Sequence, residues 1–85
     1  MTSVTGKELV TLYVVPACPL CAHARSWLKE HGIEYVERDV AANFGALRAM
    51  YKLTRQNLVP VFEANERALV RPSDVELAAF LLQAD

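Results

Sequence analysis

The chain has 85 residues and a mass of 9.5 kDa, so residues 1–85 have room for a single small domain. Hydrophobic residues make up 53% of the chain and charged residues 22%, a balance that favours a packed core over intrinsic disorder. The formal net charge of -1 gives neither the basic excess of a nucleic-acid-binding domain nor a polybasic patch for a membrane surface. We therefore expect no nucleic acid and no membrane among its partners.

The first predicted elements surround a pair of cysteines. Residues 1–8 predict a flexible N-terminus, and residues 9–15 (LVTLYVV) predict a strand buried on both faces. Apolar residues then recur at helical spacing over residues 19–31, and Gly32 marks the end of that helix. The two cysteines, Cys18 and Cys21, are too few for a secreted disulfide-stapled domain, which carries roughly four to eight. We therefore expect a cytoplasmic protein.

The rest of the chain alternates strands and helices. The pattern predicts a strand over 33–38, a helix over 43–53, strands over 60–62 and 68–70, and a final helix that ends near residue 82. Asn65-Glu66 is the predicted turn between the last two strands, although it lacks the usual glycine. Ser73 and Glu76 form a capping box at the start of the final helix. The order βαβαββα implies a parallel strand pair joined by a right-handed crossover.

The cysteine pair lies where the first strand passes into the first helix. Cys18 is expected beside the helix start, where the free N–H groups of Leu20 and Cys21 point toward its sulfur. These groups and the helix dipole favour a thiolate and lower the thiol pKa from about 8.5. Because only the thiolate attacks disulfides, we expect Cys18 to be the nucleophile and Cys21 to resolve the mixed disulfide. Leu20 is expected to be exposed beside the site, either as a partner contact or as an ordinary surface leucine.

A zinc site is the alternative use of two close cysteines. A structural zinc ion needs a full set of thiolate and imidazole ligands, and the sequence adds only His23 and His31 to the pair. His23 lies two residues past Cys21, about 200° around the helix, which makes a poor chelate. We therefore expect no metal site and no tightly bound cofactor, with His23 as a solvated helix residue.

Val59-Pro60 is the second informative feature. A proline that opens a strand cannot donate to the sheet ladder and belongs at an edge or in a special turn. If the peptide bond before Pro60 is cis, the backbone of Val59 is left exposed for a substrate to pair with. The sequence alone cannot show a cis bond, and it favours the trans isomer, because only about 5–6% of X–Pro bonds in folded proteins are cis.

The element order, the C-P-L-C pair and the later V-P dipeptide together resemble a glutaredoxin, a member of the thioredoxin-fold superfamily, from about residue 9 to residue 82. The resemblance implies an α/β fold with a four-stranded mixed sheet flanked by three helices. It implies that Cys18 is the nucleophile, Cys21 the resolving thiol and Pro60 a cis-proline facing the pair. Val59 would offer its backbone to a peptide or to glutathione, and Asp74 would lie where the family holds the γ-glutamyl end of glutathione.

The chain departs from the family pattern at positions that grip glutathione. Val15 stands where the family often has lysine, Leu58 where it has threonine, and Val70 and Arg71 near its paired glycines. Arg71 or Arg55 is a candidate partner for a carboxylate, because a guanidinium fork suits that geometry. Each is equally well read as a solvated surface arginine.

Two subgroups of the family share some of these departures. Val70-Arg71-Pro72 resembles the F-R-P sequence of glutaredoxin-like proteins that reduce ribonucleotide reductase and take electrons from thioredoxin reductase. The short segment 58–70 also resembles small bacterial glutaredoxin-like proteins.

Two hypotheses for function follow. The first is a monomeric thiol–disulfide oxidoreductase that reduces protein disulfides or glutathione mixed disulfides, with glutathione as co-substrate and with glutathione or a thioredoxin reductase as reductant. The second is a non-catalytic module that binds glutathione with an iron–sulfur cluster, or that binds peptides through Val59.

Overall fold

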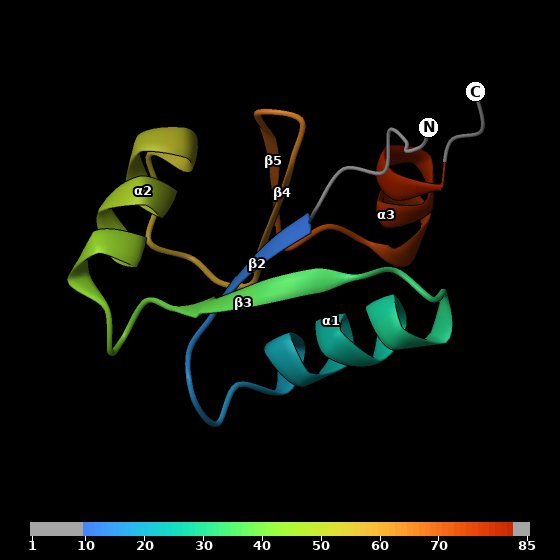
Figure 1. The fold of residues 1–85 in the computed structure, drawn as a ribbon, viewed down its shortest axis with the longest axis horizontal. Helices are drawn as coiled ribbons and strands as arrows, with labels where there is room; N and C mark the ends of the chain where they lie inside the picture. Colours follow the sequence, from blue (N-terminus) through green and yellow to red (C-terminus); the bar gives the residue numbers. More distant parts are fainter. Residues whose placement is uncertain (1–9, 83–85) are drawn as a thin grey trace.

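The computed structural model of the chain describes residues 10–82, and the predicted flexible N-terminus over residues 1–8 lies outside them. Its elements follow the predicted order (Figure 1). They are β2 (Val10–Val14), α1 (Pro19–Glu30), β3 (Tyr35–Asp39), α2 (Phe44–Thr54), β4 (Val61–Ala64), β5 (Arg67–Val70) and α3 (Asp74–Leu81). Among these residues, no helix has the length and apolar character needed to cross a membrane.

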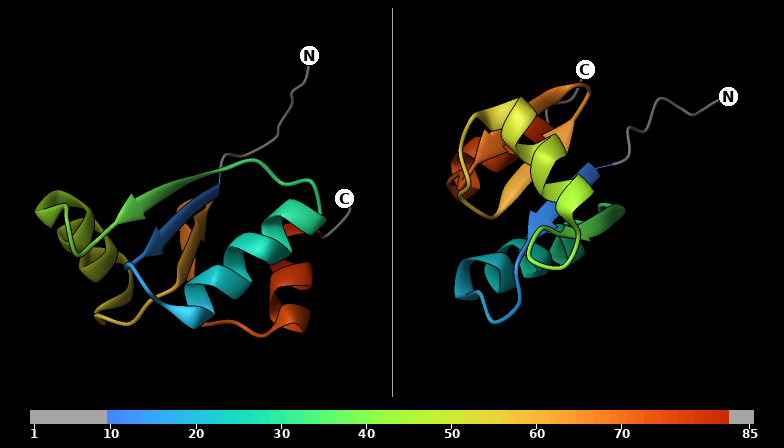
Figure 2. Two further views of the ribbon diagram at one scale, coloured as in Figure 1. Left: turned by 90° about the horizontal axis from the view of Figure 1, so that it is seen from below. Right: turned by 90° about the vertical axis from the view of Figure 1, so that its left-hand side faces the viewer.

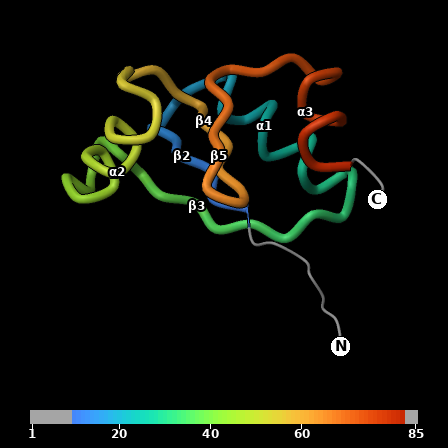
Figure 3. Tube along the Cα trace, turned by 90° about the horizontal axis from the view of Figure 1, so that it is seen from above, coloured from blue at the N-terminus to red at the C-terminus, as the bar shows by residue number. Residues whose placement is uncertain are grey.

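The strands form one mixed sheet in the order β3-β2-β4-β5. Strand β2 is parallel to β3 and antiparallel to β4, and β4 is antiparallel to β5. Helices α1 and α3 lie on one side of the sheet and α2 lies on the other (Figures 2 and 3). The predicted fold, a four-stranded mixed sheet flanked by three helices, is confirmed.

Several predicted boundaries are wrong by one or two residues, for local reasons. Strand β3 begins at Tyr35 rather than at residue 33, because the N–H of Ile33 still donates to the carbonyl of Leu28 at the end of α1 (3.0 Å). Strand β4 begins after Pro60, which has no N–H for the ladder. Helix α2 begins one residue later than predicted because Asn43 is its N-cap and accepts from the N–H of Ala46 (2.9 Å).

Two predictions for the C-terminal part of the chain are confirmed: the turn at Asn65-Glu66 and the capping box at the start of α3. Asn65 and Glu66 form a two-residue turn between β4 and β5, and both have left-handed backbone angles, with φ of 55° and 64°. Asparagine tolerates this region better than most residues, so the turn forms without glycine. At the start of α3, the N–H of Ser73 donates to Glu76 Oε1 (2.8 Å), and the N–H of Glu76 donates to Ser73 Oγ (3.1 Å).

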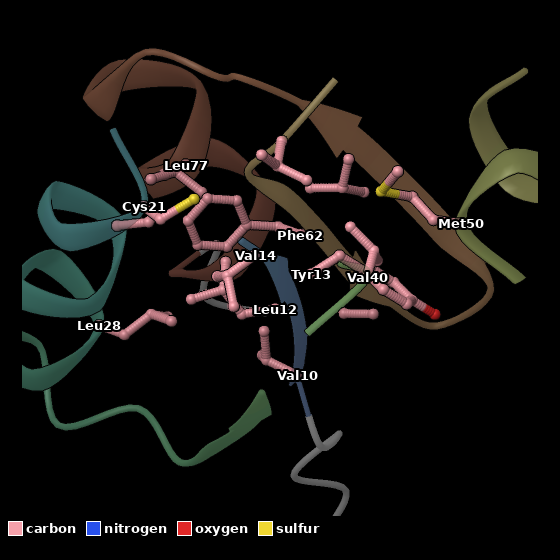
Figure 4. Close-up of a cluster of buried hydrophobic side chains, with 14 of the residues drawn as sticks. Val10, Leu12, Tyr13, Val14, Cys21, Leu28, Val40, Met50, Phe62 and Leu77 are labelled. Atoms are coloured by element: carbon pink, nitrogen blue, oxygen red, sulfur yellow. The ribbon is translucent and has the colours of Figure 1, made fainter. Parts of the chain in front are cut away.

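The core lies on both faces of β2 (Figure 4). Leu12 is fully buried toward α1 and α3, whereas Tyr13 points toward α2 and Met50. The hydroxyl of Tyr13 donates to Glu63 Oε1 at 2.7 Å, so this polar atom keeps a partner inside the protein. A strand buried on both faces, as predicted for β2, gives the cysteine loop that follows it a rigid base.

Candidate functional site

Cys18 is the N-cap of α1, as its position before Pro19 predicts. Its backbone is extended (φ -111°, ψ 111°), and its sulfur accepts the N–H of Cys21 at 3.2 Å. Its carbonyl accepts the first helical hydrogen bond, from the N–H of Ala22 (3.0 Å). The sulfur is partly exposed and faces the positive end of the helix dipole.

The surroundings of Cys18 lower the pKa of its thiol. Partial burial is the largest single influence and acts upward, because it disfavours the charged form. Four interactions together outweigh it: the thiol of Cys21, the backbone N–H groups of Cys21 and Leu20, and the positive charge of Arg71. Cys18 can therefore ionise more readily than an ordinary cysteine.

Cys21 has the opposite environment. It is fully buried, and its sulfur points into the core toward Phe62 and Leu77 (Figure 4). Burial, followed by the hydrogen bond to Cys18 and the charge of Cys18, raises the pKa of the Cys21 thiol to about 11. Both cysteines are reduced in this structure. One thiol of the pair is thus prepared to be a thiolate while the other keeps its proton.

The Val59-Pro60 peptide bond is cis, and both residues are buried. The pairing of the Val59 backbone with a substrate stays a prediction, and its carbonyl group already has one partner within the protein. The oxygen of Val59 accepts a hydrogen bond of 2.7 Å from Nε of Arg71. One of the two lone pairs of this oxygen is therefore used within the protein.

Arg71 donates two hydrogen bonds to the Val59-Pro60 segment beside the cysteines. Its backbone N–H donates to the carbonyl of Pro60 at 3.0 Å, and its side chain reaches Val59. Its φ is 47°, in the left-handed region that glycine adopts most easily. Arg55, the other candidate carboxylate partner, is the left-handed C-cap of α2 and takes no part in these contacts.

Asp74 begins α3 and is paired across the site with His23 of α1. Nε2 of His23 lies 3.0 Å from Oδ1 of Asp74, and both side chains are largely exposed. The interpretation of His23 as a merely solvated residue therefore missed a contact between two helices. Nothing in the local pattern indicates it, because the partners are 51 positions apart.

A pocket opens beside these residues and encloses about 320 Å³, including its mouth. It lies between the first turns of α1, the cis-proline and the start of α3. Its lining is mostly apolar and consists of Leu20, His23, Ala24, Pro60, Phe62, Arg71, Pro72 and Leu77. Leu20, as predicted, is exposed at 51%. Within residues 10–82, the side chains of His, Cys, Asp and Glu form no group of three that could hold a metal ion.

Comparison with known proteins places this geometry in a family. The family model described as Glutaredoxin matches residues 10–69, which is more than half of the chain. A glutaredoxin-like 8.6 kDa protein of the rubredoxin operon of Clostridium pasteurianum is 28% identical over 69 residues, covering 81% of this chain and 92% of that protein.

Longer regulators are similar over part of their length. The global transcriptional regulator Spx 2 of Bacillus cereus is 27% identical over 62 residues, covering 69% of this chain and 47% of the regulator. The regulator Spx of Bacillus subtilis is 53% identical over 32 residues, covering 38% of this chain and 24% of the regulator. The chain therefore spans about half the length of the first regulator and about a quarter of the second.

Solved structures agree on the fold. The glutaredoxin grx-1 of Archaeoglobus fulgidus superposes with a TM-score of 0.80 at 17% identity, covering 93% of this chain and 90% of that one. The thioredoxin-like protein BC3987 superposes with a TM-score of 0.79 at 21% identity, covering 85% of this chain and 99% of that one. With the family model matched over most of the described sheet and helices, the chain belongs to the glutaredoxin family.

Proposed function

We propose that this protein is a thiol–disulfide oxidoreductase in which Cys18 attacks the substrate and Cys21 resolves the product. The observation that carries the proposal is the unequal ionisation of two thiols three residues apart. The pKa of Cys18 is lowered at the start of a helix, while the pKa of Cys21 is raised to about 11 in the core. The fold and the family support this class of reaction.

The reaction takes two exchange steps. The Cys18 thiolate attacks one sulfur of a substrate disulfide, a new S–S bond forms to Cys18, and the other substrate sulfur leaves as a thiolate. Cys21 then loses its proton and attacks the Sγ of Cys18, which releases the second substrate thiol and leaves a Cys18–Cys21 disulfide. The substrate has gained two electrons from the cysteine pair, and a thiol reductant must return them.

The first step itself prepares the second. In the reduced protein, burial is the largest influence that raises the pKa of Cys21, and the hydrogen bond and the charge of Cys18 add to it. When Cys18 enters the mixed disulfide, its negative charge disappears. The pKa of Cys21 then falls, because the upward contributions of Cys18 are lost while the positive charge of Arg25 and the backbone hydrogen bond at Val15 remain.

The partners belong to the same proposal. The substrate is a protein disulfide or a glutathione mixed disulfide, and glutathione or a thioredoxin reductase returns the electrons in a reducing cytoplasm. The protein acts as a monomer. Comparing the rates at which glutathione with its reductase, and thioredoxin reductase alone, reduce the oxidised protein identifies the donor.

Two serine variants test the proposal. Cys18→Ser should lose all reduction of insulin and of a glutathionylated peptide, whereas Cys21→Ser should keep glutathione-dependent turnover of the glutathionylated peptide. Reduction by Cys18→Ser at the wild-type rate would refute the assignment. If neither substrate is reduced and the protein purified without oxygen absorbs visible light, the cluster-binding alternative replaces it.

A further inference from the structure

Cys21 must lose its proton before it can resolve the mixed disulfide, although its surroundings oppose this. Its side chain is fully buried, and burial is the largest influence that raises its thiol pKa to about 11. The core residues toward which its sulfur points, Phe62 of β4 and Leu77 of α3, carry no charge (Figure 4). The charge of Arg25 favours the thiolate, together with a backbone hydrogen bond at Val15. Arg25 is therefore the ionic side chain suited to stabilise the attacking thiolate.

Helix α1 places Arg25 beside the resolving thiol. Cys21 and Arg25 are four positions apart, so their side chains leave the same face of the helix, with Cβ atoms roughly 5–6 Å apart. Cys21 faces the core, whereas Arg25 is half-buried at its margin. Because the thiol lies inside the protein, water and salt screen the charge of Arg25 less than they screen a charge pair on the surface.

Glu37 of β3 holds the guanidinium group of Arg25 in this position. Nε of Arg25 donates to Oε2 of Glu37 at 2.6 Å, and 34% of each side chain is exposed. The contact joins the second turn of α1 to an edge strand of the sheet, where Tyr35 also acts on Arg25. The carboxylate is negative and disfavours a nearby thiolate, so it cannot replace the arginine as the stabilising charge.

Each cysteine of the pair thus has its own arginine. Arg71, which precedes α3, lowers the pKa of Cys18, the thiol of the first exchange step. Arg25 acts on Cys21, the thiol of the second step. Cys18 carries no charge once it is part of the mixed disulfide, so Arg25 then acts without the opposing charge of Cys18. A change at Arg25 should therefore alter the second step and leave the first step as it is.

We propose that Arg25 is a positioning residue for the resolving step, and that Glu37 holds its guanidinium group beside Cys21. This inference rests on the proposed function and concerns the regulation of the same pair, namely how long the mixed disulfide lasts. In this step the proton of Cys21 passes to solvent, and the Cys21 thiolate forms a bond to Sγ of Cys18. The bond between Cys18 and the substrate sulfur breaks, and the substrate leaves as a thiolate that takes up a proton.

Dipyridyl disulfide separates the two steps in a stopped-flow experiment with the fully reduced full-length protein. This neutral reagent releases one coloured thiopyridone when Cys18 attacks it and a second when Cys21 resolves the mixed disulfide. Mixing equal amounts at mildly acidic pH lets the first release run while Cys21 keeps its proton, and a jump to higher pH starts the second release. A second rate that does not depend on protein concentration shows that the resolution is intramolecular.

Variants of Arg25 test the role of its charge. Arg25→Gln should leave the first release unchanged, slow the second severalfold at neutral pH and move the pH of its half-maximal rate upward. The loss stays below about tenfold per unit of pKa, because a more basic thiolate is also the better nucleophile. Arg25→Lys keeps the charge and should restore most of the rate. Arg48→Gln, exposed on α2 at the other side of the sheet, is the matched control and should change neither release.

Glu37→Gln distinguishes an electrostatic role from a purely structural one. The glutamine oxygen can still accept the hydrogen bond from Nε of Arg25, while the negative charge that disfavours the Cys21 thiolate is gone. The second release should therefore be at least as fast as in the wild type. If the ion pair served only to hold α1 against β3, Arg25→Gln and Glu37→Gln would both slow it.

The outcomes separate this inference from the function on which it rests. An unchanged second release in Arg25→Gln, no recovery in Arg25→Lys, or equal slowing in Arg25→Gln and Glu37→Gln would overturn the role of Arg25 and leave the oxidoreductase intact. A wild-type protein that releases no thiopyridone, or that never releases the second one, would overturn the proposed function and the role of Arg25 with it.

Discussion

Arg71 and Val59 lie 12 positions apart in the chain and are joined by a hydrogen bond of 2.7 Å from the guanidinium Nε to the carbonyl oxygen. The pairing of β4 with β5, in which Val61 lies opposite Val70, brings the two residues together. The same arginine lies near enough to Cys18 for its charge to lower the thiol pKa. One side chain thus connects the cis-proline segment to the electrostatics of the redox cysteine.

Removal of the arginine charge should make Cys18 less reactive. Burial acts upward on the pKa of Cys18, and the hydrogen bonds and Arg71 act downward. Arg71→Gln therefore raises the pKa, and the pH at which iodoacetamide alkylates Cys18 at half its maximal rate should move upward. Arg55→Gln is the control and should leave the profile unchanged. An identical profile for wild type and Arg71→Gln would show that the arginine does not act on the thiol.

The thiol of Cys21 should support the Cys18 thiolate as a hydrogen-bond donor. Cys21→Ala removes this donor and should raise the pKa of Cys18, whereas Cys21→Ser supplies a hydroxyl and should restore most of the lost effect. Because the site is fully buried, the alanine variant should also lose about 1 kcal/mol of stability from the missing sulfur. Chemical denaturation and alkylation of both variants separate the two effects. If alanine and serine gave the same alkylation profile, the donor role would be excluded.

The two thiols should contribute to stability with opposite dependence on pH. The pKa of Cys18 is lower in the folded protein than in the unfolded chain, so its contribution is present at high pH and is lost as the pH falls through the folded pKa. The pKa of Cys21 is raised to about 11, so its contribution is present below the ordinary thiol pKa and is lost as the pH rises toward 11.

The measurable quantity is the difference in unfolding free energy between the reduced wild type and each serine variant. For Cys18→Ser this difference should increase with pH up to the ordinary thiol pKa, with a slope of at most about 1.4 kcal/mol per pH unit. For Cys21→Ser it should decrease above that pKa. Urea denaturation in a series of buffers gives both curves, and parallel flat curves would contradict the assigned shifts.

The capping box should hold α3, and with it Asp74, in place. Ser73→Ala removes the oxygen that accepts the N–H of Glu76 and should cost about 1 kcal/mol. For a domain of this size the loss lowers the melting temperature by roughly 4–8 °C. Ser26, exposed in the middle of α1, provides the matched control, and Ser26→Ala should change the melting temperature little. Equal melting temperatures for the two variants would show that the capping box does not stabilise the fold.

The features that could be predicted from the sequence are those that local chemistry specifies. Pro19 after Cys18 predicts the start of α1, and Ser73 with Glu76 predicts the start of α3, because N-caps and first-turn residues act within a few positions. The contacts that could not be predicted join distant segments. His23 meets Asp74 across 51 positions, which follows only from the packing of α1 beside α3.

Arg71 shows the same limit. Its difference from the family's glycine pair was visible in the sequence, and its suitability for a carboxylate suggested a role in binding. Its bond to Val59 requires the register of the β4–β5 hairpin and a left-handed backbone at a residue other than glycine. Neither the register nor the left-handed backbone can be predicted from the residues next to Arg71.

Alkylation of the two cysteines across a pH series, with each site quantified by mass spectrometry, tests the central proposal most directly. In the folded protein Cys18 should react at a pH below that required after denaturation in urea, while Cys21 stays unmodified until the pH approaches 11. A Cys18 that needs the same pH in folded and denatured protein, or a Cys21 that reacts first, would contradict the mechanism.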